Sequence, residues 1–302
     1  MMSAKQDTSN NNIMMSCCAS CGTSEGDGGI QLKDCTACGS VQYCSDACQE
    51  LHLPEHAGKC RKRAAELRDE LLFRQPESSH RGDCPICQLP FPLDINKCVY
   101  HSCCSKVACM GCVIANMRRL KDERLEHSCP FCRDVTLTSD VKKMNMKRIQ
   151  ANDPSAICQA GTKRFNEGKF LESIQHYSKA AELGDAEAHF KLAIMYRFGQ
   201  GVEKDEKKEI YHLEEAAIKG HPDARYQLGI TEGRKGREDR AEKHLIIAAN
   251  LGHDQSLQTL KELYKTGSVS KEDFASTLRA HRDAVIATKS PQREAAEQGS
   301  NK

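Results

Sequence analysis

The chain has 302 residues, of which 39% are hydrophobic and 28% are charged, and its formal net charge at pH 7 is +2. This composition is typical of a globular protein of two or three small domains and argues against a disordered chain. No run of about 18 apolar residues is present, so we expect no membrane-spanning helix. Residues 1–16 are polar and lack the features of a secretory signal, so we expect a disordered N-terminus and a cytoplasmic or nuclear protein in a reducing compartment.

Cysteine is the unusual residue of this chain. Of the 18 cysteines, 17 lie between Cys17 and Cys132, and most form Cys-x2-Cys pairs. Such pairs without a secretory signal favour metal binding over a disulfide scaffold. Binding about four zinc ions through about fifteen thiolates would bring the formal charge to about −5, so we expect other proteins rather than nucleic acid as partners.

Residues 17–60 contain the first cluster of metal-ligand residues. Its eight positions form four doublets: Cys18 and Cys21, Cys35 and Cys38, Cys44 and Cys48, and His56 and Cys60. Eight thiolate and imidazole ligands suffice for two tetrahedral zinc sites, and four protein ligands per ion are typical of structural rather than catalytic zinc. A segment this short depends on the metal for its folding free energy.

The order of these doublets and the run YCSDACQ at residues 43–49 resemble the MYND zinc finger. The resemblance implies interleaved ligands, with Cys18, Cys21, Cys44 and Cys48 on one zinc ion and Cys35, Cys38, His56 and Cys60 on the other. Cys17 competes with Cys18, and His52 with His56, but the spacing favours Cys18 and His56. The family usually has Trp where this chain has Leu53, and in some members that Trp shapes a groove for proline-rich peptides.

Residues 61–82 are predicted to be a helical linker, with a helix over residues 61–74 followed by a loop. Residues 83–135 then carry three further doublets, Cys84 and Cys87, Cys109 and Cys112, and Cys129 and Cys132. Their order resembles a RING finger and implies one site made by Cys84, Cys87, Cys109 and Cys112. Cys104, Cys129 and Cys132 would belong to the second site.

The second RING-like site departs from the family pattern. Lys106 stands at the position of the usual histidine ligand, and a protonated lysine has no lone pair for a metal. We predict Cys103 as the fourth ligand, with His101 and Cys98 as alternatives. This segment is therefore predicted to be a variant RING-like finger.

Three residues of this segment bear on a partner. In ubiquitin-ligase RINGs, the positions of Ile86 and Pro130 contact the ubiquitin-conjugating enzyme, and a basic residue at the position of Arg133 contacts both that enzyme and ubiquitin. The resemblance therefore implies a ubiquitin-conjugating enzyme as a partner. The alternative is that Ile86 packs between the zinc sites and Arg133 is merely solvated. A helix is predicted over residues 111–125.

A repeat begins after a connector at residues 136–153. The motif Ala-Ala-x-x-Gly ends at Gly184, Gly220 and Gly252, at steps of 36 and 32 residues. Each unit is predicted to be two helices, with the glycine at a helix C-cap and Pro222 at a first helical position. The pattern resembles the Sel-1-like repeat, a relative of the tetratricopeptide repeat, over residues 154–267. The repeated Ala, Leu and Tyr positions are predicted to be core.

The C-terminal part is predicted as a capping helix within residues 268–289, with Ser270 at its N-cap, and a loose tail over residues 290–302. The predicted fold class is therefore small zinc-stabilised finger modules, of the treble-clef or cross-brace type, followed by an all-α helical-repeat solenoid. The sequence shows no nucleotide loop, nucleophile elbow or open metal site. We expect a zinc-binding scaffold or adaptor, and the alternative is a ubiquitin ligase that selects substrates with its solenoid.

Overall fold

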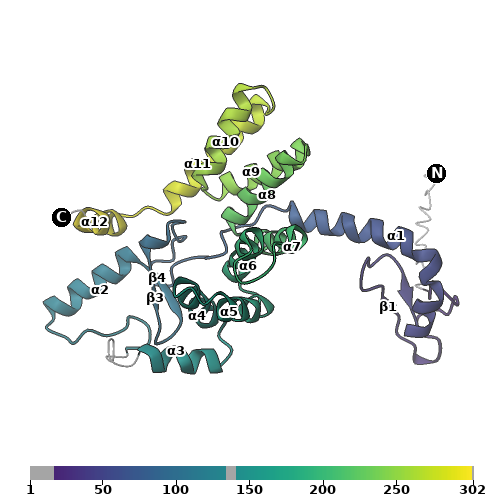
Figure 1. Ribbon diagram of the computed structural model, residues 1–302, viewed down its shortest axis with the longest axis horizontal. Helices are drawn as coiled ribbons and strands as arrows, with labels where there is room; N and C mark the ends of the chain where they lie inside the picture. The colour runs from purple at the N-terminus through teal and green to yellow at the C-terminus, as the bar shows by residue number, and fades with distance from the viewer. Residues whose placement is uncertain (1–16, 134–140, 301–302) are drawn as a thin grey trace, which may run out of the picture. The chain divides into compact units, whose positions relative to one another are not determined.

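The computed structural model describes residues 17–133 and 141–300 (Figure 1). The predicted disorder of residues 1–16 lies outside these residues, as do residues 134–140 of the connector. The chain divides between Leu72 and Phe73 into two compact units. Within the described residues, no helix is both long and apolar enough to cross a membrane.

The first unit is a small hairpin followed by one long helix. The hairpin pairs β1 (Lys33–Asp34) with β2 (Gln42–Tyr43) in antiparallel register, and it is preceded by the short 3-10 turn η1 (Asp27–Gly29). Helix α1 (Asp46–Leu72) is continuous, so the helix predicted from residue 61 is only its second half. The sequence obscured the first half because metal-ligand residues and Pro54 stand where an apolar stripe would otherwise be expected.

The second unit opens with a further hairpin and helix. After the 3-10 turn η2 (Ile95–Lys97), strands β3 (Cys98–His101) and β4 (Lys106–Cys109) form an antiparallel pair, and α2 (Met110–Asp122) follows directly. Helix α2 ends three residues before the predicted end, because Arg124 has a left-handed backbone conformation with φ of 54°. Both cysteine-rich segments therefore share the hairpin-then-helix arrangement of a treble clef.

The rest of the second unit is helical. Helix α3 (Val141–Gln150) lies within the predicted connector. It is followed by pairs of consecutive helices, α4 (Pro154–Asn166) with α5 (Phe170–Glu182), α6 (Ala186–Phe198) with α7 (Glu206–Ile218), α8 (Pro222–Arg234) with α9 (Glu238–Asn250), and α10 (Asp254–Lys265) with α11 (Lys271–Ala287). Each helix packs on its pair partner, and successive pairs stack on one another. The prediction of an all-α repeat solenoid is confirmed.

Residues in the turns determine where these helices begin and end. Gly184, Gly220 and Gly252 all have positive φ, of 90°, 83° and 88°, as predicted for residues that end a helix. Pro222 stands in the first turn of α8, as predicted. The N-caps His221 and His253 were not foreseen: each ring accepts a hydrogen bond from a backbone amide in the first turn of its helix.

The solenoid core consists of the repeated small and branched residues. The alanine pairs preceding the three glycines are buried, as are Leu192, Leu228 and Leu260. Close approach of alanines lets the paired helices pack at short distance. The tyrosine positions were wrongly expected to be core, because Tyr196 is only half-buried and Tyr264 is 37% exposed.

The C-terminal prediction is right for the cap and wrong for the tail. Ser270 accepts a hydrogen bond from the Asp273 amide and begins α11, as predicted. The tail is not loose, because α12 (Pro291–Ser300) forms and packs on α2, burying Arg293 and Ala296. The sequence of α12 contains few apolar residues, so its packing depends on a distant helix that sequence periodicity cannot reveal.

Candidate metal centres

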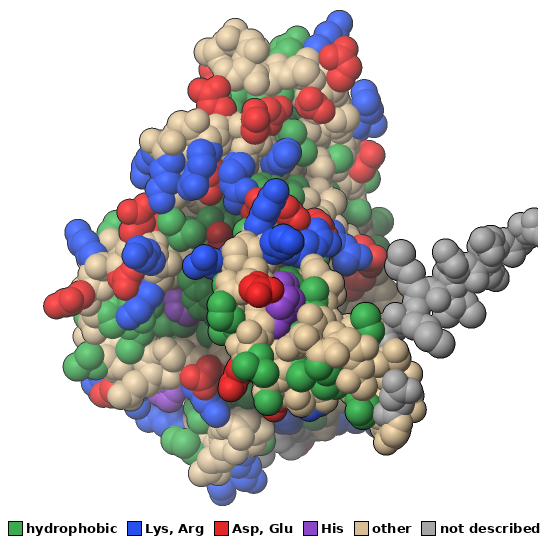
Figure 2. Space-filling view, turned by 90° about the vertical axis from the view of Figure 1, so that its right-hand side faces the viewer, with side chains coloured by type: hydrophobic (Ala, Val, Ile, Leu, Met, Phe, Trp, Pro, Cys, Tyr) green, Lys and Arg blue, Asp and Glu red, His purple; other side chains and the backbone are tan. Residues whose placement is uncertain are grey.

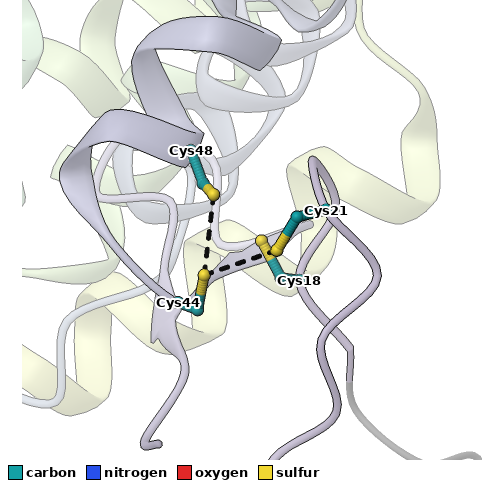
Figure 3. Close-up of side chains that lie close together, drawn as sticks. All are labelled: Cys18, Cys21, Cys44 and Cys48. Atoms are coloured by element: carbon teal, nitrogen blue, oxygen red, sulfur yellow. Dashed lines mark hydrogen bonds between the residues drawn. The ribbon is translucent and has the colours of Figure 1, made fainter.

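The first group of ligands joins the N-terminal loop to the start of α1. Cys18 and Cys21 lie on a tight turn closed by the hydrogen bond from the Gly22 amide to the Cys18 carbonyl, while Cys44 and Cys48 flank the first turn of α1. The Cys44 sulfur lies 3.5 Å from the Cys21 sulfur and 3.5 Å from the Cys48 sulfur (Figure 3). The structure thus brings together one of the two predicted sets.

The second group is more deeply buried. Cys35 and Cys38 lie on the turn between β1 and β2, and His56 and Cys60 are one helical turn apart on α1. The Cys35 and Cys60 sulfurs are 3.7 Å apart, and His56 Nε2 lies 3.3 Å from the Cys38 sulfur.

The two alternative ligands of the first finger lie outside both groups. Cys17 is exposed and belongs to neither of them. His52 instead places its Nδ1 3.1 Å from the Tyr43 hydroxyl and stacks on His56. The structure therefore groups Cys18 and His56, and not their neighbours, with the remaining ligands.

The third group is the first predicted RING-like site. A tight turn holds Cys84 and Cys87, and Cys109 and Cys112 lie at the end of β4 and in the first turn of α2. The Cys87 and Cys109 sulfurs are 3.8 Å apart, and the Cys109 amide donates to the Cys84 sulfur. Arg293 of α12 adds a donor from far along the chain, with its Nη2 3.2 Å from the Cys87 sulfur.

The fourth group contains Cys103, Cys104, Cys129 and Cys132. Cys104 lies 4.0 Å from the Cys103 sulfur and 3.8 Å from the Cys129 sulfur. The adjacent cysteines occupy the turn of the β3–β4 hairpin, and this turn points both sulfurs to one side.

The hairpin register explains why the other candidates do not join the fourth group. Cys98 pairs with Cys109 at the opposite end of the hairpin, beside the third group. His101 packs edge-on against Phe131 instead, and Lys106 places its ammonium over the same ring. Position in the hairpin, rather than spacing in the sequence, separates Cys103 from its two competitors.

The distances within the four groups fit a tetrahedral metal. A zinc–sulfur bond of about 2.3 Å gives sulfur–sulfur edges of about 3.8 Å, whereas a disulfide needs about 2.05 Å. The measured sulfur–sulfur separations of 3.5–4.0 Å match the former, and all of these cysteines are free. The described residues thus include four Cys/His groups capable of binding zinc, each with four possible ligands.

The ionisation of these cysteines also suits a cation. Burial raises the pKa of the Cys18 and Cys35 thiols, but hydrogen bonds from backbone amides outweigh it and bring each to about 6. The pKa values of two neighbouring thiols are raised instead. Hydrogen bonds shared with nearby sulfurs raise the pKa of Cys44 to about 12. Burial, and secondly hydrogen bonds shared with sulfurs, raise the pKa of Cys60 to about 11. In the first two groups, the lowered and raised pKa values favour one thiolate beside a protonated thiol, and a bound cation would favour the thiolate form of both.

The three predicted partner-binding residues lie at the surface of the RING-like module. Ile86 is 43% exposed, Pro130 is half-buried, and Arg133 is exposed with a left-handed backbone. The Arg133 amide donates to the Cys129 carbonyl and so closes the turn that holds Cys129 and Cys132.

A fifth group of possible ligand atoms, made by His80, Glu187 and His221, was not predicted from the sequence. The two imidazole rings stack with centroids 4.1 Å apart and planes 5° apart. A histidine binds a metal through a lone pair in its ring plane, so two parallel stacked rings do not direct their lone pairs at one ion. The group is instead a carboxylate held by two imidazoles, with Lys191 as a further ion-pair partner of Glu187.

Comparison with known proteins agrees with this geometry. A family model for the MYND finger matches residues 18–60, and a model for the Sel1 repeat matches residues 160–185, 186–221 and 222–253. The chain contains a MYND finger and Sel1 repeats. The RING-like resemblance rests only on the third and fourth cysteine groups.

Three known proteins are similar to parts of the chain. Chitin synthase regulatory factor 4 of Schizosaccharomyces pombe is 30% identical over 89 residues, which is 29% of this chain and 14% of that protein. A Sel1 repeat protein from Oxalobacter formigenes has 26% identity and a TM-score of 0.42, covering 50% of this chain and 66% of its own. The protective antigen c5321 of uropathogenic Escherichia coli has 22% identity and a TM-score of 0.40, covering 50% of this chain and 34% of its own. The chain thus spans about a seventh of the curated relative that it matches.

Proposed function

We propose that this protein is a zinc-dependent adaptor whose MYND finger and Sel1 solenoid bind different partner proteins. The observation that carries the proposal is the completeness of the four Cys/His groups, each of which has four protein ligands. Catalytic zinc keeps a position open for water, whereas closed sites serve folding. The zinc ions would then hold the fingers in shape and supply no chemistry of their own.

The surface supports protein partners. Figure 2 shows Lys and Arg side chains gathered in a band across the middle of one face, with Asp and Glu side chains beside and between them. Exposed leucines occur on both units, with Leu53 52% exposed in the MYND finger and Leu171 69% exposed on α5. The name of the fission-yeast relative, a regulatory factor, is in keeping with a protein that acts through others.

The test is capture of partners by the full zinc-loaded chain through chemical cross-linking, comparing Leu53→Asp with Leu171→Asp. Each change puts a charge on an exposed leucine of one module. We expect each variant to lose a different set of partners at least tenfold, with zinc content and helix content unchanged. Loss of the same set in both variants, or no specific partner for the wild type, would contradict the proposal.

A second candidate function is ubiquitin ligation, favoured by the exposure of Ile86 and Arg133 at the surface of the RING-like module. Such a ligase would restrain the thioester of a conjugating enzyme without forming a covalent bond itself. The test is autoubiquitination with a panel of conjugating enzymes. Activity lost in both Ile86→Ala and Arg133→Ala would support this function, and silence across the panel with zinc content verified would exclude it.

A further inference from the structure

The segment that enters the second unit, residues 73–82, has no helix or strand of its own and lies against the Sel1 repeats (Figure 1). Two of its backbone polar groups are satisfied by the repeats. The His80 amide donates to the Gly220 carbonyl at 3.0 Å, and the Arg225 guanidinium donates to the Arg74 carbonyl at 3.3 Å. The residues of this segment are exposed or half-buried, and these two hydrogen bonds hold its backbone on the repeats as they would hold a bound peptide.

One end of the segment is anchored by an aromatic side chain. The Phe73 ring packs on the His244 ring with centroids 4.7 Å apart, and the Arg240 guanidinium lies 4.7 Å from the centre of the Phe73 ring. His244 is fully buried, and neither of its ring nitrogens has a hydrogen-bond partner among the described residues. A neutral, unbonded imidazole is an aromatic contact surface, so this part of α9 is suited to an incoming aromatic ring.

The other end is anchored by an imidazole. His80 stacks on His221, and both Nε2 atoms approach Glu187, at 3.5 Å from His80 and 3.3 Å from His221. His221 Nδ1 accepts the Ala224 amide as the N-cap of α8, so its Nε2 carries the proton and donates to Glu187. The second imidazole needed to complete this arrangement comes from outside the repeats.

A glycine in the middle makes room for the segment. A Cβ built on Gly220 would lie 2.8 Å from the Ser78 carbonyl oxygen and 3.4 Å from Pro76. The equivalent Gly184 and Gly252 would meet only side-chain atoms, at 3.5 Å or more. All three glycines end helices, but Gly220 alone among the three also admits a foreign backbone.

We propose that Glu187, His221, Arg225, His244 and Asn250 form a peptide-docking track on the Sel1 repeats, and that residues 73–80 occupy it as an intramolecular ligand. Asn250 belongs to the track because its amide donates to the Gln75 side chain at 3.1 Å. The partner that fits is an extended peptide with an aromatic residue at one end and, seven residues later, an imidazole or a cation facing Glu187. This deepens the proposed function, on which it rests, by naming the chemistry of one partner.

The segment also regulates the track. A ligand tethered at both ends has a high effective concentration, so a free peptide of equal intrinsic affinity cannot compete well with it. A partner then binds only with higher affinity or after the segment has been released. Because residues 73–82 connect α1 to the RING-like module, release also lengthens the free tether between the two units of the chain.

The test is titration of a fluorescent peptide, residues 72–83, into the full zinc-loaded chain, followed by anisotropy. A variant with Phe73→Ser and His80→Ala removes both anchors of the segment and is called the strap-release variant. We expect at least tenfold tighter peptide binding by this variant than by the wild type, and loss of that gain when Glu187→Gln and His244→Ala are added. A matched control, Phe198→Ser with His127→Ala, changes the same residue types at exposed positions and is expected to behave as wild type.

Limited trypsin digestion of the wild type provides a second measurement that does not depend on a variant folding. Arg74 is as exposed as Arg124, and Arg81 is half-buried, but hydrogen bonds to the repeats hold the backbone on either side of these sites. Cleavage after Arg74 and Arg81 is therefore expected to be at least tenfold slower than cleavage after Arg124. Equally fast cleavage overturns the proposal, and so does a folded strap-release variant that does not bind the peptide. If partners are nevertheless captured, only the docking track is wrong; if the peptide binds but no partner is captured, the adaptor function is wrong.

Discussion

Replacing Cys103 by serine tests the least predictable of the zinc ligands. The sulfur positions assign Cys103 to the fourth group and leave Cys98 and His101 outside it. Structural zinc contributes roughly 10–16 kcal/mol, so an equal share for one of four ligands is about 2.5–4 kcal/mol, or about 60–700-fold in the dissociation constant. Cys103→Ser is therefore expected to loosen one zinc ion by this factor.

The assay is zinc release to a colorimetric chelator, with total zinc measured by elemental analysis. Wild-type protein is expected to hold about four zinc ions, and Cys103→Ser to release one of them at about 100-fold lower chelator concentration. Cys98→Ser and His101→Gln serve as matched controls and should behave as wild type. If Cys98→Ser loosens one ion and Cys103→Ser does not, the reasoning from sulfur positions is refuted.

Four further predictions follow from packing and charge. Gly161→Ala should destabilise the repeats by about 1–2 kcal/mol, because the new Cβ would lie 2.8 Å from the Tyr177 ring. Gly233→Ala on α8 would make no contact under 3.7 Å and should stabilise the repeats by about 0.5–1 kcal/mol. Melting temperatures that shift in the same direction for both variants would contradict this prediction. Burial, and secondly the charges of nearby arginines, lower the pKa of His244 to about 3 in the folded chain. Below about pH 6.5 the unfolded chain binds a proton at this imidazole and the folded chain does not, so the free energy of unfolding falls as the pH falls. His244→Leu should therefore raise the free energy of unfolding at pH 7 by about 1 kcal/mol. Between pH 7 and pH 5, urea denaturation should show that the variant loses about 2 kcal/mol less of this free energy than the wild type. An unchanged pH dependence would count against a buried neutral ring. Arg293→Gln should speed zinc release from the third group about tenfold, because it removes a charge-assisted hydrogen bond to the Cys87 sulfur. Arg282→Gln serves as a control at an exposed position. Equal release rates for the two variants would mean that the Arg293 contact has no effect on the metal. Excess chelator should abolish the hairpins of the fingers but leave most of the far-ultraviolet helix signal, because the repeats bury their own core; loss of all helix signal at once would show that the solenoid also needs zinc.

Several features of this protein could be derived from the sequence because they are local. A Cys-x2-Cys doublet closes on one tight turn, so its two ligands face the same way whatever surrounds it. The glycines at 184, 220 and 252 needed positive φ to end their helices, and the alanine pairs before them set the helix spacing. These signals each depend on fewer than about ten consecutive residues, and they were enough to predict the MYND finger and the solenoid.

Other features were decided only by tertiary structure. Spacing favoured Cys103 as the fourth ligand but left His101 and Cys98 as alternatives, and the register of the β3–β4 hairpin separates the three residues. Helix α12 lacks an apolar stripe, and its docking depends on Arg293 reaching backbone and sulfur groups about 200 residues earlier in the chain.

Residues 75–82 were predicted to be a loop because they contain Pro76, two serines and Gly82, and Phe73 and Arg74 were predicted to end the preceding helix, which stops instead at Leu72. Their contacts with Gly220 and His244 involve residues more than about 140 positions away, and none of them leaves a pattern in the linker itself. Local geometry can be read from neighbouring residues, whereas the contacts of an irregular segment depend on which distant surface the fold places beside it.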